Sequence, residues 1–400
     1  MKYDSQVTSI MKYHVAIYCP DRHILYDAGR QPDKRGVGGG VVARIRLAQS
    51  LASLGHEVEL ICNCPRRELH LGVNYVPLNE ARKIEADILV LTTSGDKLDI
   101  SPVLDLDLSV KLTLLVVHGV PKINGIQEVR PDKFYLISNF IKDVVETEWG
   151  VDLKERSFVS YHGVNKSFYQ RSYWHKLLRS RNNFQLAYVG NPVKGRDTTL
   201  QVFRLLRKLD SRYRLAIFGD EKLWGGEIRR IRIEAGVRNY GSVPQRKLAQ
   251  LLLTCGFSLF LQTIREGFGL SLIETMTAGC IPIVSAVGAF PEIIQHGKNG
   301  FLVNGDPMDT STQQDVAALI HKLQRDRTQL EEIRENAIRS TFEWREVALA
   351  WEQHWDIVLG NTDIKQYQTA QACPACSKKM YALEDGFHCL NCGHFTRKLM

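Results

Sequence analysis

The sequence has no run of apolar residues long enough to cross a membrane. A spanning helix needs about 20 such residues in succession, whereas the longest apolar stretches, such as Leu112–Val117, have the length of a strand. Residues 1–12 are polar and lack the apolar segment of a secretory signal peptide. These two absences predict a protein with no integral membrane segment, whose only membrane contact would be peripheral.

The sequence also lacks the cysteine pattern of a secreted disulfide framework. Five of its nine cysteines are scattered, most of them beside apolar runs, as expected for small buried residues. This usage is typical of a reducing compartment, so we expect a cytoplasmic protein. The scattered residues are Cys19, Cys62, Cys64, Cys255 and Cys280.

No strong charge bias points to a particular partner. The formal net charge is +8 over 400 residues, which is too mild to predict nucleic-acid binding. A solvated basic surface explains it, although an anionic substrate or membrane surface would also fit. With 44% hydrophobic and 24% charged residues, the composition is that of a globular protein, and the length predicts two domains plus a small addition.

Strands and helices are expected to alternate along the chain, in a pattern that restarts once. Short apolar runs predict strands from Tyr13–Cys19 to Phe158–Tyr161 and again from Leu186–Gly190 to Gly300–Val303. Such alternation predicts α/β domains with mostly parallel sheets covered on both faces. The expected order is a polar extension, two tandem Rossmann-like domains, a C-terminal helix that can return to the first domain and a polar linker, at residues 1–12, 13–168, 169–340, 341–359 and 360–372.

A glycine-rich segment, residues 266–274, follows an expected strand and opens an expected helix. Glycines let backbone amides approach a ligand closely, and the helix start adds the positive end of its dipole, so this segment predicts a phosphate site. Glu266 and Glu274 flank the site, where their carboxylates suit sugar hydroxyls. On spacing alone, two acids that favour a helix N-terminus and face water would explain the pattern better.

The longer segment Arg265–Glu292 resembles the hallmark of the retaining GT-B glycosyltransferases of family 4. It combines two glutamates that have seven residues between them with the run Ala278–Val284 and the pair Pro291-Glu292. The resemblance covers about residues 13–359. It implies two Rossmann-like domains facing a cleft, with the nucleotide-sugar donor mainly on the second domain and a glycan, lipid-linked or small-molecule acceptor mainly on the first.

The resemblance also assigns roles to single residues. Glu274 would bind ribose hydroxyls, Glu266 would hold the donor sugar, and Lys194 would neutralise the leaving diphosphate. His118, at the end of an expected strand, would lie near the transferred sugar, which makes His118, Lys194 and Glu266 the candidate catalytic residues. The other candidate donor-binding residues are Gly39, Gly40, Asn191, Arg196, Val243, Gly267, Phe268, Gly269 and Leu270. We expect no catalytic metal, since no paired acidic motif is placed to bind one.

One departure leaves alternatives open. Family members commonly carry an arginine where Asn191 stands, and Arg196 is a shifted candidate to replace its charge. If neither residue reaches the diphosphate, a non-catalytic nucleotide-sugar or glycan-binding protein comes into consideration. Another GT-B enzyme, such as a nucleotide-sugar epimerase, would need different acids in the cleft. A dinucleotide site at Gly38–Gly40 is disfavoured, because no acidic residue follows the second expected strand.

The remaining four cysteines form two CxxC pairs near the C-terminus. Cys373 and Cys376 are separated from Cys389 and Cys392 by twelve residues, a spacing that predicts a structural zinc ribbon at residues 373–400. A redox pair is the less favoured alternative. Four cysteine ligands leave no open position on the metal, so the site would be structural rather than catalytic. The tail would then serve self-association, docking to a protein partner or nucleic-acid contact; the sequence does not choose among these, and docking is favoured.

Overall fold

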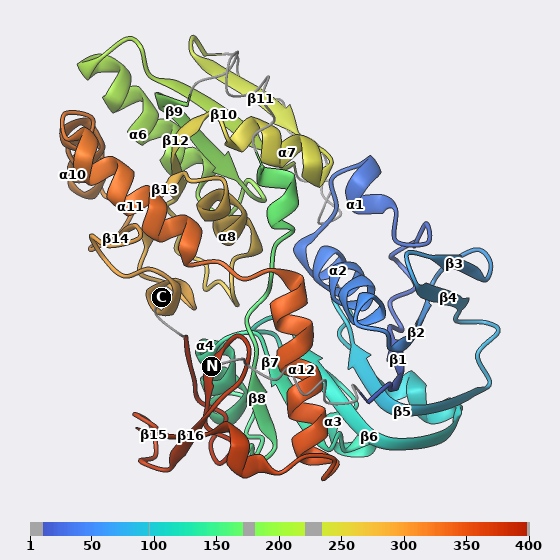
Figure 1. Cartoon of the computed structure of the whole chain (residues 1–400). Helices are drawn as coiled ribbons and strands as arrows, with labels where there is room; N and C mark the ends of the chain where they lie inside the picture. The colour runs from blue at the N-terminus through green and yellow to red at the C-terminus, as the bar shows by residue number, and fades with distance from the viewer. Residues whose placement is uncertain (1–10, 96, 171–180, 221–233, 398–400) are drawn as a thin grey trace, which may run out of the picture.

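The computed structural model describes residues 11–95, 97–170, 181–220 and 234–397. The expected N-terminal extension lies outside these residues except for its last two. Residues 171–180, which belong to the polar stretch expected to join the domains, also lie outside them. Two α/β domains stand side by side, and a small β-sheet tail lies next to α4 and β8 of the first domain (Figure 1).

The first domain is built on an eight-stranded sheet in the order β3-β4-β2-β1-β5-β6-β7-β8, parallel except for β3. Its strands are β1 His14–Tyr18, β2 Glu57–Cys62, β3 Glu68–His70, β4 Val73–Pro77, β5 Lys83–Thr92, β6 Asp107–Val117, β7 Lys133–Leu136 and β8 Ser157–Val159. Its helices are α1 Gln31–Lys34, α2 Gly39–Ser53, η1 Ser101–Asp105, α3 Ile126–Val129 and α4 Asn139–Thr147. The strand order reverses beside β1, and ligands of open α/β sheets bind at such a point.

The second domain repeats this plan with six parallel strands in the order β11-β10-β9-β12-β13-β14. Its strands are β9 Asn182–Val189, β10 Arg214–Phe218, β11 Val237–Gly241, β12 Cys255–Phe260, β13 Ile281–Ser285 and β14 Phe301–Val303. Its helices are η2 Lys166–Tyr169, α6 Arg196–Leu209, α7 Gln245–Leu252, α8 Leu270–Thr277, α9 Phe290–Ile293, α10 Thr310–Leu323 and α11 Arg327–Arg339. All six residues of β12 are buried, as in a strand covered on both faces.

Two features differ from the expected element pattern. β3 and β4 form an antiparallel pair at the sheet edge that the apolar runs singled out from the sequence do not include. The glycines expected to precede a helix instead begin it, since Gly39 and Gly40 form the first turn of α2 and Gly38 is its N-cap. The missing side chains leave the start of this helix open on the side where the two domains meet.

The chain crosses between the domains twice, at one place. Val164 N donates to Phe342 O over 2.8 Å, and Val164 pairs with Glu343 in an isolated bridge. A Cβ on Gly163 would lie 2.5 Å from Trp344 N, so only glycine allows this approach. The two crossing segments therefore form a single paired connection.

After the second crossing, helix α12, Trp344–Val358, packs on the first domain (Figure 1). The Trp351 indole N–H donates to Ser160 Oγ over 2.8 Å, and Tyr135 Oη and His354 Nδ1 are 2.5 Å apart. The Trp355 side chain is fully buried, edge-on to Tyr13 of the N-terminal segment. Residues near the end of the second half thus complete the core of the first.

The tail is a four-stranded antiparallel sheet that follows η4, Ile364–Tyr367. Its strands are β15 Gln368–Ala372, β16 Lys379–Ala382, β17 Gly386–His388 and β18 Phe395–Arg397. β15 pairs with β16 although it lies in the segment expected to be a linker, so the tail begins before the first cysteine. Among the described residues, no helix is long and apolar enough to span a bilayer.

Candidate active site

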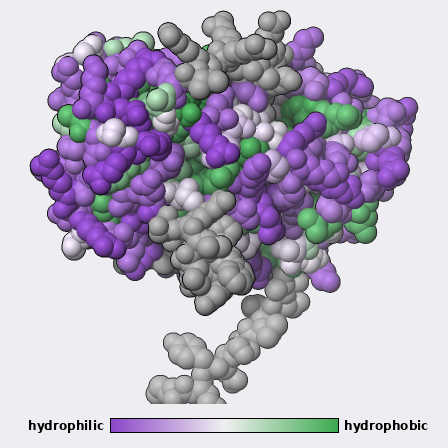
Figure 2. Space-filling view, turned by 90° about the horizontal axis from the view of Figure 1, so that it is seen from above, coloured by the Kyte–Doolittle hydropathy of each residue, from purple (hydrophilic) through white to green (hydrophobic). Residues whose placement is uncertain are grey.

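A cleft between the two domains brings together most of the residues singled out from the sequence. It contains about 1250 Å³ of open space, including its mouth, which is ample for a drug-sized ligand. Apolar side chains are visible between the hydrophilic surfaces of the two halves (Figure 2). Candidate residues that line the cleft are His118, Lys194, Glu266, Gly39, Gly40, Asn191, Val243, Phe268, Gly269, Leu270 and Glu274.

On the second-domain side, Lys194 and Glu266 form an ion pair. The Lys194 Nζ and Glu266 Oε2 atoms are 2.7 Å apart, and the side chains are 24% and 19% exposed. Lys194 follows β9 and Glu266 follows β12, which are neighbours at the point where the strand order of this sheet reverses. A Cβ on Gly195 would lie 2.0 Å from Leu261 O, so glycine is needed to bring the Lys194 loop this close to β12.

The start of α8 opens into the same cleft beside this ion pair. Gly269 caps the helix in the left-handed region at φ +96°, and a Cβ there would lie 2.7 Å from the Phe290 ring. Leu270 and Ser271 line the cleft, and the first amides of a helix have no acceptor within it. These amides, the helix dipole and the Lys194 ammonium together favour an anionic ligand.

Glu274 lies deeper in the cleft and is only 7% exposed. It accepts a hydrogen bond from Gln245 Nε2 over 3.0 Å. Gln245 Oε1 in turn accepts from Arg46 Nε of the first domain over 3.0 Å, and Arg46 pairs with Asp33. Burial raises the pKa of Glu274 to about 7, against the opposing effects of the Gln245 hydrogen bond and the Arg46 charge.

If Glu274 binds the ribose hydroxyls of a nucleotide, as the resemblance implies, its raised pKa predicts pH-dependent binding. The carboxyl group ionises as the pH rises through about 7, and only the carboxylate is free to accept hydrogen bonds from two ribose hydroxyls at once. We expect the affinity for an intact nucleotide-diphosphate sugar to increase about tenfold between roughly pH 6 and pH 8, as the ionised fraction grows.

Titration calorimetry across this pH range measures the effect. The Glu274→Gln variant keeps the size and the Gln245 contact of the side chain but cannot ionise, so its affinity should be low and independent of pH. A variant that kept the pH dependence of the wild type would assign the titration to another group.

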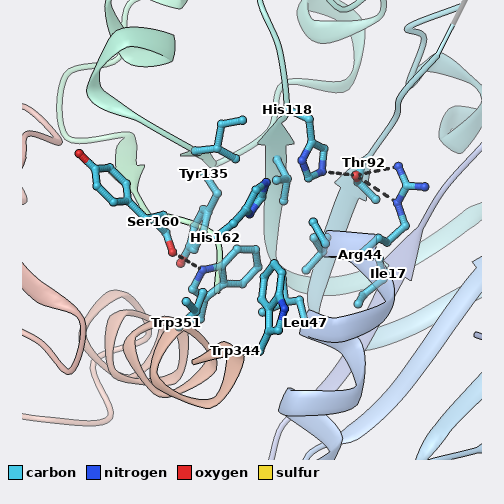
Figure 3. A pocket seen from close by; sticks show the side chains of 16 residues that line it. Ile17, Arg44, Leu47, Thr92, His118, Tyr135, Ser160, His162, Trp344 and Trp351 are labelled. Carbon is cyan, nitrogen blue, oxygen red and sulfur yellow. Dashed lines mark hydrogen bonds between the residues drawn. The ribbon is translucent and has the colours of Figure 1, made fainter. Parts of the chain in front are cut away.

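On the first-domain side, His118 is held by Thr92 (Figure 3). Thr92 Oγ1 accepts from Arg44 Nη2 over 3.2 Å, so its own proton is available for His118 Nε2 at 3.0 Å. Burial, together with nearby His162 and Arg44, holds the pKa of His118 well below its usual range. The Nδ1 atom of the ring is buried and has no hydrogen-bond partner among the described residues.

Arg44 belongs to a buried polar network at the ends of β1 and β5. Its Nη2 lies 3.4 Å from Asp21 Oδ2, and both side chains are 1% exposed. Asp21 also accepts from Thr93 Oγ1 over 2.6 Å and from Ser94 N over 2.9 Å. The network fixes the position of Thr92 and hence of His118.

Glycines of the first domain form the facing wall of the cleft. A Cβ on Gly36 would lie 2.6 Å from Ser242 Cβ of the second domain, so the two domains meet closely there. Gly39 faces the Leu270 side chain, 3.7 Å from where its own Cβ would be. The starts of α2 and α8 therefore face each other at the cleft.

Two candidates do not line the cleft as far as the structure describes it. Arg196 begins α6 and lies 3.5 Å from Asp197. Gly267 serves the domain contact, since its carbonyl accepts from Ser138 Oγ over 2.6 Å. Asn191 lines the cleft, but its side-chain oxygen accepts from Val193 N over 3.1 Å within its own loop.

Sequence reasoning missed several residues that hold the candidate site residues in place. Gln245 and Arg46 support Glu274 from two elements, and Thr92 supports His118. Each is an ordinary polar residue in a helix or at a strand end, without a motif around it. Only the tertiary arrangement identifies these residues.

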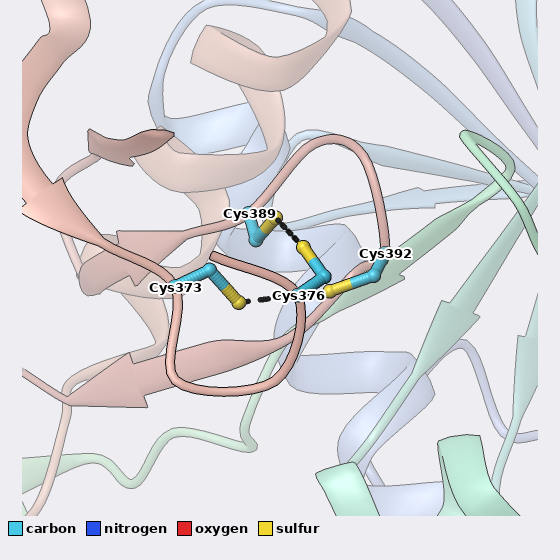
Figure 4. A group of neighbouring side chains, drawn as sticks. All are labelled: Cys373, Cys376, Cys389 and Cys392. Carbon is cyan, nitrogen blue, oxygen red and sulfur yellow. Dashed lines mark hydrogen bonds between the residues drawn. The ribbon is translucent and has the colours of Figure 1, made fainter. Parts of the chain in front are cut away.

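The four tail cysteines also lie together, as their spacing predicts (Figure 4). Their sulfur atoms are all within 4.8 Å of one another, which forms a group that could hold a metal ion. The Sγ atoms of Cys373 and Cys392 are 3.7 Å apart, and those of Cys376 and Cys389 are 3.5 Å apart. This group lies outside the cleft.

Comparison with known proteins finds a similarity in the second domain. Residues 175–340 match the sequence profile of the glycosyl transferases group 1. This segment is similar to the glycosyl transferases group 1. The cleft residues Lys194, Glu266 and Glu274 all lie within it.

The chain also has curated relatives and structural neighbours. The GDP-mannose:cellobiosyl-diphosphopolyprenol alpha-mannosyltransferase of Komagataeibacter xylinus is 28% identical over 207 residues, which are 50% of this chain and 50% of that protein. The chain spans half or less of the length of the curated relatives that it matches.

Solved structures are similar over most of the chain and share its GT-B fold. A glycosyltransferase from Rickettsia africae has a TM-score of 0.62 at 15% identity and covers 88% of this chain and 100% of its own. Anabaena HepE in complex with UDP-glucose has a TM-score of 0.58 at 17% identity, covering 87% of this chain and 100% of its own. The predicted GT-B fold is confirmed.

Proposed function

We propose that this protein is a retaining glycosyltransferase that moves a sugar from a nucleotide-diphosphate sugar to an acceptor hydroxyl. The observation that carries the proposal is the Lys194–Glu266 ion pair at the start of α8, across the cleft from His118. It offers a cation for a diphosphate beside a carboxylate for sugar hydroxyls. The similarity of residues 175–340 to the glycosyl transferases group 1 supports the same chemistry.

In this proposal the donor replaces the Lys194–Glu266 contact with contacts of its own. The ammonium of Lys194 and the first amides of α8 bind the diphosphate, Glu266 accepts hydrogen bonds from the sugar, and Glu274 accepts them from the ribose. Val243 also lines the cleft, and in this proposal it contacts the base of the nucleotide. Charge that develops on the leaving phosphate is then stabilised by groups already aimed at it.

The proposed transfer occurs on one face of the sugar. The bond from the anomeric carbon to the diphosphate oxygen breaks, and the bond to the acceptor oxygen forms on the same side. The proton of the acceptor hydroxyl passes to the leaving phosphate, so no protein base is required. His118, kept neutral by burial, donates a hydrogen bond from Nδ1 to an oxygen of the transferred sugar.

We propose a glycan or lipid-linked acceptor bound mainly to the first domain. The printed name of the Komagataeibacter xylinus relative describes a diphosphopolyprenol-linked acceptor and GDP-mannose as donor, which makes GDP-mannose the first donor to try. A lipid-linked acceptor fits a cytoplasmic protein that contacts the inner face of a membrane peripherally.

We also propose that the tail cysteines bind a structural zinc ion. Zinc–sulfur bonds of about 2.3 Å in a tetrahedron place sulfur atoms about 3.8 Å apart. The sulfur separations of 3.5 and 3.7 Å fit this requirement. Four thiolates would complete the coordination of the ion and leave no position for substrate.

A donor panel tests the proposed function. The full chain is incubated with GDP-mannose, UDP-glucose and other nucleotide-diphosphate sugars, and binding is followed by thermal shift, because a ligand of the folded state raises the midpoint. For donors that bind, we expect slow release of free nucleotide without acceptor and faster release with a glycan or lipid-linked acceptor. Tight binding without turnover for any acceptor would favour a nucleotide-sugar-binding protein instead.

A further inference from the structure

The tail contacts its own first domain through the loop that carries the second cysteine pair. Glu155 N donates to Asn391 O over 3.0 Å, and a Cβ on Gly393 would lie 1.9 Å from Ser157 Oγ. The His388 ring stacks on Phe158 with centroids 4.5 Å apart and an angle of 11° between the rings. The segment that carries Cys389 and Cys392 therefore packs directly on the start of β8.

Next to this contact, Asn139 joins the tail to both domains. Phe395 N donates to Asn139 Oδ1, and Asn139 Nδ2 donates to Phe395 O, each over 2.9 Å. Asn139 Nδ2 also donates to Glu292 of the second domain over 3.0 Å. One side chain at the start of α4 thus contacts all three parts of the molecule.

Glu292 caps α4 from the opposite domain. Its carboxylate accepts from Asn139 N over 2.9 Å, from Phe140 N over 3.0 Å and from Tyr161 Oη over 2.6 Å. These bonds satisfy amides at a helix start that the helix itself leaves unpaired. A partly buried carboxylate with this many hydrogen bonds is a fixed point of the domain contact.

This junction leads directly to the proposed donor site. Ala289, which precedes α9 and Glu292, donates its N–H to Glu266 O over 2.9 Å. The Tyr161 ring lies between Phe395 of the tail and Phe268 of the cleft, with centroid distances of 4.6 and 5.2 Å. The tail is therefore separated from the Glu266–Phe268 segment by a single layer of side chains.

We infer that the metal-holding tail is an internal positioning element for the donor site. When the four cysteines hold their ion, the loop on β8 and strand β18 stay seated, Asn139 stays paired, and Glu292 and Tyr161 keep the Glu266–Phe268 segment in place. No described residue of the tail lines the cleft. The effect of the tail on donor binding rests on the proposed function. Its structural support of α4 and of the segment after β12 is independent of that function.

Hydrogen exchange of the full chain tests the physical part. Removal of the ion by a chelator should speed exchange about tenfold or more in peptides covering residues 139–147 and 266–274, because local opening becomes easier. Strand β9, away from the junction, is the internal control and should be unchanged. Addition of Zn²⁺ should restore slow exchange. Loss of the ion without faster exchange in either peptide would overturn the inference.

If removal of the ion unfolds the protein, a substitution that leaves the cysteines intact provides a second test. Phe395→Ala removes the ring against Tyr161, and Tyr381→Ala on β16 of the same sheet is the matched control. We expect Phe395→Ala to keep its metal, speed exchange at residues 266–274 and raise the donor KM about fivefold with a smaller change in kcat. Unchanged exchange in Phe395→Ala would also overturn the inference. If no donor is ever turned over, the proposed function fails, while the exchange result still decides the role of the tail.

Discussion

Replacing Lys194 with alanine should lower kcat for sugar transfer by about 10²–10³-fold, the usual effect of removing one group that stabilises transition-state charge. The ammonium lies 2.7 Å from Glu266 at the start of α8, where the diphosphate is proposed to sit. Without the ammonium, only the helix amides stabilise the charge that develops on the leaving phosphate. Steady-state rates at saturating donor measure the loss.

The variant should remain folded, because a partly exposed ion pair contributes little to stability. Lys322→Ala, an exposed lysine on α10, is the matched control and should keep the full rate. A kcat for Lys194→Ala within threefold of the wild type would remove Lys194 from the proposed chemistry. It would then reopen the question of whether Arg196 supplies the charge.

Replacing Arg44 with leucine should destabilise the first domain by about 3–5 kcal/mol, because it leaves a buried carboxylate without its countercharge. Arg44 and Asp21 are both 1% exposed, so water cannot replace the lost partner. Urea unfolding followed by tryptophan fluorescence measures the change. Trp149, Trp344, Trp351 and Trp355 all pack in the core cluster that includes the first domain, so the signal reports on this half of the molecule.

The double variant Asp21→Asn with Arg44→Leu should recover part of this loss, since no uncompensated charge remains. Arg22→Leu is the control, because Arg22 is exposed next to Asp21 and surface substitutions usually stay within about 0.5 kcal/mol. If Arg44→Leu behaved like Arg22→Leu, the buried network would not be what fixes Thr92 and His118.

The sequence predicts the two tandem sheets and most of the cleft because both depend on local patterns. Buried parallel strands such as β12 appear as continuous apolar runs, and strand-to-helix turns such as that at Gly269 carry their glycines in the sequence. Lys194 and Glu266 each follow a strand end, and parallel strands bring such ends to one edge of the sheet. Their positions in the cleft follow from this topology.

What the sequence does not predict is how distant segments pair across the domains. Glu292 lies in a recognisable Pro-Glu pair, yet its carboxylate caps α4 of the other domain. Arg46 belongs to a regular helix and supports Glu274 through Gln245. β15 has no apolar alternation, because four of its five residues are exposed, so only its hydrogen bonds to β16 make it a strand. Contacts of this kind depend on three-dimensional placement, which leaves no periodic trace in the chain.

The return of α12 has a consequence for the order of events during biosynthesis. Trp355 packs against Tyr13, and His354 lies within hydrogen-bond distance of Tyr135. Both α12 residues are synthesised only after the whole second domain. The first domain therefore cannot complete its core until α12 has been synthesised, whereas the second domain can fold earlier. Domains usually fold in the order in which they are synthesised, but here we expect the first domain to complete its fold last.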